Sequence, residues 1–175
     1  MDAEGCHSIG EQMIPFTGQS SLKQYIKSKP KNGDTKYGFA PGSQAMYMTE
    51  FYQRAGNRPD KVLGLSADVV VRLSRSLAGK CHKVYFYNLF TTLPLLKHLQ
   101  KEKIYAVGTL RKNRLMGAES VLASDKDLRE RGAASYATNE EDITIVKWND
   151  NNFVHTASTF AGMQPVDTVK RWDKK

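Results

Sequence analysis

The chain has 175 residues, 40% of them hydrophobic and 25% charged, a composition that supports one packed domain and argues against global disorder. No apolar run approaches the roughly 20 residues of a membrane span, and the first residues lack the basic and apolar regions of a secretory signal. Lys and Arg number 26 against 18 Asp and Glu, a net charge of +8, which favours a polyanionic partner such as nucleic acid, with a soluble protein that is simply basic as the equal alternative.

The first elements in chain order are two short strands and a helix. Residues 35–52 predict the strands, around a turn at Pro41-Gly42, because Thr, Tyr and Phe suit a pleated surface. The helix is expected over Ala67–Leu77, with Ser66 as its N-cap and Gly79 as its end. One face of this helix carries four aliphatic residues: Val69, Val70, Leu73 and Leu77.

A strand, a second helix and another strand follow. The strand lies near Lys83–Tyr87, a mostly apolar run of the length typical of a buried central strand. Thr92 and Pro94 begin a helix that extends to about Lys101, and residues 104–110 (IYAVGTL) predict the next strand. This alternation of strands and helices indicates a sheet that is at least partly parallel.

The chain beyond Arg114 is less regular. Residues 115–142 are polar, which favours a loop with one short helix near Asp125–Arg131. Two strand-like runs within residues 143–160 then predict a hairpin, because residues 149–152 have the composition of a turn. The charged tail over residues 161–175 is expected to fray, and residues 1–8 are expected to be flexible.

Four sequence blocks, taken together, identify a family resemblance. They are GEQMIPFTG at 10–18, VYFYNLFTTLPLL at 84–96, GTLRKNR at 108–114 and VKWNDN at 146–151. In this order, and over residues 9–174, they resemble the catalytic domain of piggyBac transposases. The resemblance implies an α/β fold, a ribonuclease H-like mixed sheet flanked by helices, here incomplete and degenerate. Residues 9–114 would form the first part of that core and residues 115–142 an insertion-like segment.

The resemblance also implies a reaction that this chain is not equipped to perform. Family enzymes cut and rejoin DNA with Asp side chains that hold two Mg²⁺ ions, because hard cations prefer oxygen ligands. The first Asp position is Gly10 here and the second is Tyr87, and neither side chain can replace a carboxylate. The third is expected soon after the last strand, where Thr159, Phe160, Ala161 and Gly162 stand before Asp167. We therefore expect no catalytic residue, no metal and no enzymatic activity.

Other residues were considered as replacements or as separate sites. Glu11 neighbours Gly10 but would face the opposite side of a strand, and Asp150 is more simply a turn residue. The pairs Cys6-His7 and Cys81-His82 lack zinc-site spacing. Cys81 is expected to begin a buried strand, and Cys6 to lie in a loose N-terminus. Two cysteines make no disulfide framework, so a nuclear or cytoplasmic location is expected. The aromatic residues around the second block are expected to be core rather than a base-stacking surface: Tyr85, Phe86, Tyr87 and Phe90.

Clustered cations are the candidate DNA-binding residues. One cluster comprises Lys23, Lys27, Lys29 and Lys31 with Lys36, and a second comprises Arg111, Lys112 and Arg114. We expect weak, non-specific DNA binding by an inactive transposase core. The resemblance also implies a Cys- and His-rich zinc module, which two cysteines cannot supply, so recognition of transposon ends is not expected. The alternatives are an active metal-dependent transposase or nuclease with relocated carboxylates, and an interaction module or pseudogene product without a DNA function.

Overall fold

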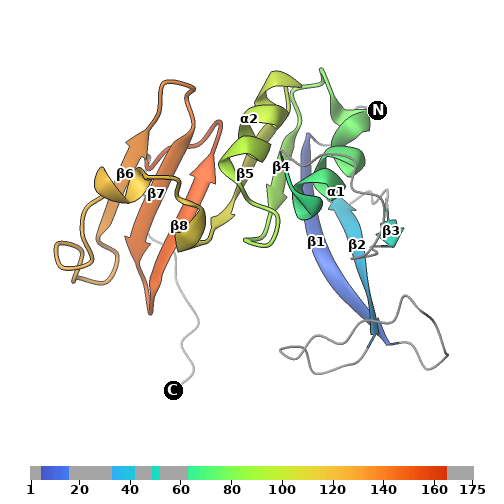
Figure 1. Ribbon diagram of the computed structural model, residues 1–175. Coiled ribbons are helices and arrows are strands. Elements are labelled where there is room, and N and C mark those ends of the chain that lie inside the picture. The colour runs from blue at the N-terminus through green and yellow to red at the C-terminus, as the bar shows by residue number, and fades with distance from the viewer. Residues whose placement is uncertain (1–4, 16–32, 42–48, 52–62, 165–175) are drawn as a thin grey trace.

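One mixed sheet of eight strands, in the order β3-β2-β1-β4-β5-β8-β7-β6, runs through the chain in the computed structural model (Figure 1). The structure describes residues 5–15, 33–41, 49–51 and 63–164, and all eight strands lie within these ranges. The strands are β1 (Cys6–Pro15), β2 (Gly33–Pro41), β3 (Thr49–Phe51), β4 (Lys83–Phe86), β5 (Tyr105–Leu110), β6 (Ala134–Thr138), β7 (Thr144–Asn149) and β8 (Phe153–Ser158).

The pairing pattern confirms the partly parallel sheet expected from the sequence. Strands β1, β4 and β5 lie side by side and parallel, with Ile9 opposite Phe86 and Phe86 opposite Gly108. Strands β2 and β3 continue the sheet from β1 in antiparallel pairing. Strand β4 ends opposite Ile9, whereas β1 continues to Pro15 in pairing with β2. The carboxyl end of β4 therefore lies beside the middle of β1, and carboxyl ends of parallel strands are where ligand sites form in open α/β sheets.

Two α-helices lie in front of the sheet in Figure 1. The second, α2 (Leu93–Lys101), begins as predicted, because the Thr92 hydroxyl accepts a hydrogen bond from the Leu95 amide at 3.3 Å. The first, α1 (Leu65–Ser74), continues as a 3₁₀ turn, η1 (Arg75–Leu77), before Gly79 reverses the chain at φ 75°. The N-cap prediction at Ser66 was wrong, because the N-cap is Gly64 and the helix begins at Leu65, two residues earlier than predicted.

The core lies between the helices and one face of the sheet. Alternate residues of β4 and β5 point into it, as the two-residue period of a strand requires. The other face of these strands carries Tyr85 and Tyr105, each 39% exposed. The buried residues that join both helices to the sheet are Ile9, Val69, Val70, Val84, Phe86, Leu95, Leu96 and Leu99. Burying each of these apolar side chains contributes about 1.5–3 kcal/mol.

The C-terminal strands extend the same sheet. Strand β8 pairs antiparallel with β5, with Val107 opposite Ser158. The predicted β7–β8 hairpin is present. Strand β6 lies inside the segment 115–142 that was expected to be irregular, and it forms because β7 supplies its backbone partners. Strand β1 likewise begins at Cys6, within residues expected to be flexible, because the start of β4 pairs with it. Of the predicted tail, residues 165–175 lie outside the described residues.

The segment between β5 and β6 contains no α-helix near Asp125–Arg131, contrary to the prediction. It folds as turns and two short 3₁₀ helices, η2 (Lys112–Arg114) and η3 (Ala118–Ser120). Side chains from β7 hold it in place. The buried Lys147 ammonium donates to the Ala123 carbonyl at 2.7 Å and pairs with Asp125 at 2.6 Å, and the Asn149 amide donates to the Leu128 carbonyl at 2.8 Å. Among the described residues, no helix is long and apolar enough to cross a membrane.

Candidate functional site

Gly10 and Tyr87 lie side by side where β4 ends next to the middle of β1. Ile9 and Phe86 are register partners, so the next residue on each strand faces the other across the pair. A Cβ atom placed on Gly10 would be 3.8 Å from the Tyr87 Cε2 atom, an ordinary van der Waals contact. The two positions that correspond to family Asp residues therefore converge from neighbouring strands.

The chemistry of this pair does not fit two divalent metal ions. Gly10 has no side chain, and Tyr87 presents a phenol that is 65% exposed. Mg²⁺ takes carboxylate and other oxygen ligands in octahedral geometry, and neither position offers a carboxylate. Across the residues that the structure describes, no cluster of three or more His, Cys, Asp or Glu side chains could hold a metal ion. What remains at this position is an exposed phenol beside a glycine, with the exposed cations Arg111 and Lys112 on the adjoining segment.

The loop that follows Tyr87 is held closed by its own backbone and by Arg114. The Tyr87 carbonyl accepts hydrogen bonds from the Phe90 amide at 3.0 Å and the Thr91 hydroxyl at 3.1 Å. The Arg114 Nη1 atom lies 3.1 Å from the Asn88 carbonyl, 3.0 Å from that of Leu89 and 2.9 Å from that of Thr91. Burial, and then the charge of Arg111, lower the Arg114 pKa from its ordinary value. Its guanidinium therefore binds protein carbonyls, a role that the sequence did not reveal.

Arg111 and Lys112 are the cations that the fold presents beside this loop. Both side chains are exposed. The Arg111 Nη2 atom reaches the Asn88 Oδ1 atom at 3.5 Å, and Lys112 forms a 3.7 Å ion pair with Asp125. Asn88 is therefore a site residue that the sequence analysis did not single out, and its position next to Tyr87 is the signal that could have found it.

The first lysine cluster cannot be placed against the site. Its members Lys23, Lys27, Lys29 and Lys31 lie outside the described residues, and Lys36 is in β2 without a described side chain. Their assignment as DNA-binding residues stays a prediction.

The stretch expected to hold a third carboxylate lies beside the amino-terminal halves of β4 and β5, where the Phe160 ring centroid is 6.3 Å from that of Tyr85. The Thr159 hydroxyl accepts a hydrogen bond from the Ala106 amide at 2.9 Å, and the Phe160 ring lies 5.9 Å from that of Tyr105. Ala106 is the register partner of Val84, three residues before Tyr87 and so about 10 Å away along the strand. Thr159 and Phe160 therefore do not converge with Gly10 and Tyr87. Asp167 lies outside the described residues.

The cysteine and histidine pairs meet without forming a metal site. The His7 Nε2 and His82 Nδ1 atoms are 2.6 Å apart, and the two rings are stacked. Burial, and then His82, lower the His7 pKa. Both cysteines are free and exposed, so the placement of Cys81 in a buried strand was wrong, and Cys6 belongs to β1.

The aromatic side chains around the second sequence block divide between the two faces of the sheet. Phe86 and Phe90 are in the core, as predicted. Tyr85 and Tyr87 are exposed, contrary to the prediction that all four are core residues.

Comparison with known proteins agrees with this architecture. The family model described as "Transposase IS4" matches residues 4–175. The piggyBac transposable element-derived protein 3 of Homo sapiens is 33% identical over 96% of this chain, and so is the chimeric ERCC6-PGBD3 protein of Homo sapiens; the chain covers 29% and 16% of these relatives. The piggyBac transposable element-derived protein 2 of Homo sapiens is 28% identical over 96% of the chain and 29% of its own length.

A solved structure shares the fold. The piggyBac transposase in a synaptic complex with hairpin DNA superposes with a TM-score of 0.80 at 24% identity, over 96% of this chain and 35% of that one. The mixed sheet with its flanking helices is therefore the fold of that piggyBac transposase over the matched region, in agreement with the fold class expected from the sequence. The chain belongs to the transposase family whose model it matches, as a piggyBac transposable element-derived sequence, and it spans under a third of the length of its curated relatives.

Proposed function

We propose that this chain is a transposase core that no longer cuts DNA and that binds DNA weakly and without sequence preference. The observation that carries the proposal is the Gly10–Tyr87 pair. The two positions adjoin where β4 ends beside β1, and neither supplies a carboxylate. Two-metal strand transfer requires both ions to be held against the attacking and leaving oxygens, so the loss of two ligands removes the reaction while leaving the sheet intact.

Arg111 and Lys112 support the DNA-binding part of the proposal. Both side chains are exposed beside the loop that follows Tyr87, and the Arg111 guanidinium contacts the Asn88 side chain in that loop. The chain carries a net charge of +8, and a structural neighbour is a transposase bound to hairpin DNA. Phosphate contacts by such cations release counterions and give affinity without sequence information. Of the two expected locations, nuclear or cytoplasmic, a role on DNA favours the nuclear one.

A titration of labelled duplex DNA tests this binding. Fluorescence anisotropy at 50 and 200 mM NaCl should give a Kd on the order of 10⁻⁴–10⁻⁶ M near physiological salt, with a steep loss at the higher concentration. The double variant Arg111→Glu/Lys112→Glu should weaken binding equally for unrelated sequences and flatten the salt dependence. The matched control is Lys126→Glu/Arg129→Glu, which makes the same charge change at exposed residues of the turns before β6. No binding at 50 mM NaCl, or strong sequence preference, would contradict the proposal.

A relocated catalytic site is the competing function. It requires carboxylates that converge from elsewhere, and Glu11 and Asp150 are the candidates considered from the sequence. Asp150 accepts hydrogen bonds from Arg131 at 3.2 and 3.4 Å at the β7–β8 turn, and Arg131 neutralises its charge there. Because Arg131 already binds the Asp150 carboxylate, we prefer the proposed function without DNA cleavage. Metal-dependent nicking of plasmid DNA distinguishes the two readings.

A further inference from the structure

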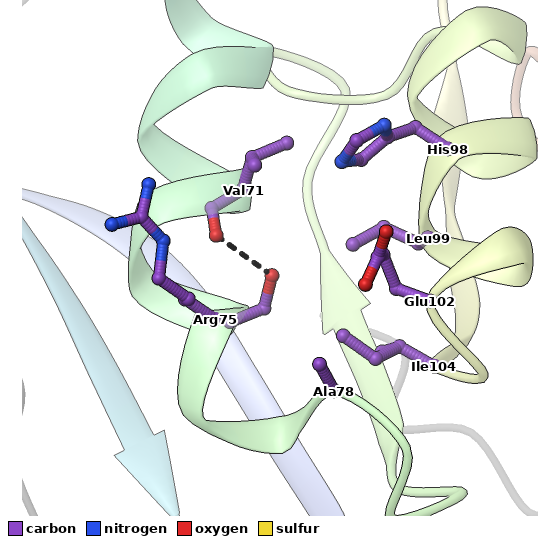
Figure 2. Close-up of a pocket in the computed structure, with 8 residues that line it drawn as sticks. Val71, Arg75, Ala78, His98, Leu99, Glu102 and Ile104 are labelled. Carbon is purple, nitrogen blue, oxygen red and sulfur yellow. Dashed lines mark hydrogen bonds between the residues drawn. The ribbon is translucent and has the colours of Figure 1, made fainter.

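A cavity of about 260 Å³ lies between the C-terminal ends of α1 and α2 (Figure 2). Ala78 and Ile104 line it and precede β4 and β5, so the cavity is at the opposite end of these strands from Tyr87. Its floor is apolar: Leu99 and Ile104 are 1% and 2% exposed, and Val71 lies on the α1 side. Ala78 forms the outer wall and is exposed. The Ser74 hydroxyl, also in the lining, donates to the Val70 carbonyl at 2.7 Å. The floor is therefore apolar, and the Ser74 hydroxyl in the lining is already hydrogen-bonded within α1.

The size of the cavity limits what it can hold. Pockets for drug-sized ligands and cofactors have volumes of about 300–1,000 Å³, and this cavity is smaller. Its volume suits a single aliphatic or aromatic side chain delivered from outside. Burying one such side chain is too little for strong binding alone, so the rim must add to it.

The rim, meaning the cavity lining together with the residues that adjoin it in the chain, is basic. Arg75 lines the cavity and is exposed. Three exposed lysines stand one or two residues along the chain from lining residues: Lys80, Lys101 and Lys103. Backbone hydrogen bonds hold the two loops together: the Gly79 amide donates to the Glu102 carbonyl at 2.9 Å, and the Cys81 amide to the Lys103 carbonyl at 3.1 Å.

One carboxylate interrupts this basic rim. Glu102, which lines the cavity, is the acidic side chain of the group. Within the described part of the chain, none of the four cations forms an ion pair with an acidic residue. The rim therefore has cationic side chains available to a partner.

We propose that this cavity is a docking site for an acidic protein segment that inserts one leucine-like side chain. The apolar floor takes the side chain, and the four rim cations attract the flanking carboxylates. Duplex DNA fits less well, because its phosphate backbone has no apolar side chain to place in the cavity. The site lies at the other end of the strands from Arg111, so peptide and DNA can bind at the same time. The proposal is independent of the DNA-binding function.

The test uses a fluorescein-labelled acidic peptide with two central leucines flanked on each side by three glutamates. Anisotropy titration of the 175-residue chain should give saturable binding that weakens from 50 to 200 mM NaCl. Ala78→Phe should fill the cavity mouth and weaken binding by about tenfold, which is the effect of roughly 1.4 kcal/mol. Arg75→Glu should weaken it severalfold through charge reversal at the rim. Arg129→Glu, a matched control at an exposed arginine in the turns before β6, should leave the affinity within about twofold.

Two peptide controls separate this site from simple charge attraction. A peptide with alanines in place of the leucines should bind about tenfold more weakly, and unlabelled duplex DNA should not displace the leucine peptide. Equal binding of both peptides, or displacement by DNA, would overturn the proposal. If Ala78→Phe fails to fold by circular dichroism, methyl NMR of the unmodified chain replaces it. Peptide-induced shifts should then centre on Leu99 and Ile104, and shifts confined to other residues would overturn the proposal.

Discussion

Gly108 of β5 and Thr91 of the loop after β4 are in such close apposition that no side chain fits between them. A Cβ atom on Gly108 would lie 2.5 Å from the Thr91 hydroxyl oxygen and 2.6 Å from the Phe86 carbonyl oxygen. Thr91 is fully buried, and its hydroxyl donates to the Tyr87 carbonyl. This contact joins two of the sequence blocks that resemble transposases, and it fixes the loop that carries Tyr87 and Asn88.

Gly108→Ala should therefore destabilise the fold. The added methyl group meets backbone as well as side-chain atoms, so the loop must move, at a cost of about 1–3 kcal/mol. Urea unfolding measures the loss. Gly162→Ala is the matched control, because a Cβ there meets nothing within 4 Å, and it should change the unfolding free energy by less than about 0.5 kcal/mol. Equal midpoints for the two variants would show that the apposition is not a constraint.

Arg114→Gln should loosen the same loop. The substitution removes a guanidinium nitrogen that lies within 3.1 Å of three loop carbonyls, and hydrogen bonds to charged groups are each worth about 1.5–3 kcal/mol. Amide hydrogen exchange at Phe90 and Thr91 should accelerate in the variant. Arg111→Gln is the control, since its side chain is exposed and its removal should leave those amides protected. Unchanged exchange in Arg114→Gln would show that Arg114 does not stabilise the loop, and would leave its charge available to bind DNA.

Stability should fall as the solution is acidified below pH 6.5. Burial first, and then the charges of Lys147 and Lys112, lower the pKa of His155 below its ordinary value of 6.5, and burial and His82 lower that of His7. Each folded-state pKa lies below the unfolded value. The stabilisation is therefore complete above pH 6.5 and is lost as the pH falls through the folded-state values.

Urea midpoints at pH 7.5 and 5.0 measure this dependence. Lys147→Met keeps the length of the buried side chain and removes one cause of the lowered His155 pKa, so the loss of stability on acidification should be smaller in this variant. A larger loss, or no pH dependence in the unmodified chain, would contradict the assignment.

Elements with local signals were predictable from the sequence. The α2 helix follows from Thr92 and Pro94, whose effects operate within a single turn. The approach of Gly10 to Tyr87 followed from the family resemblance. The start of α1 was misplaced because Ser66 is a good capping residue in isolation, whereas the chain turns into the helix at Gly64 with φ 80°.

Features that depend on distant partners were not predictable. Strand β6 consists of small and polar residues (ASYAT) and has little strand signal until β7 pairs with it. Arg114 was grouped with the phosphate-binding cations because its carbonyl partners, from Asn88 to Thr91, are more than twenty residues away in the chain. The exposure of Tyr85 could not be predicted either, because a strand of four residues does not reveal which of its faces the helices cover.

Restoring two carboxylates should not restore cleavage. Gly10→Asp is expected to fold, because its Cβ would meet only the Tyr87 ring at 3.8 Å, and Tyr87 is exposed. The double variant Gly10→Asp/Tyr87→Asp should still lack nicking activity, because Thr159 and Phe160 place no third carboxylate near the pair. Circular dichroism checks folding. Nicking by the double variant would show that a third ligand already converges on the site.

Nicking of supercoiled plasmid by the unmodified chain is the most direct test of the central claim. The assay uses 5 mM Mg²⁺ or Mn²⁺, with EDTA as the blank and an active piggyBac transposase as the positive control. Because Gly10 and Tyr87 hold no carboxylate at the strand ends, the account predicts no conversion to open circles beyond the EDTA blank, although the plasmid is bound and retarded at low salt. Metal-dependent nicking that is lost on Glu11→Gln or Asp150→Asn would contradict it, and would place an active site elsewhere on the chain.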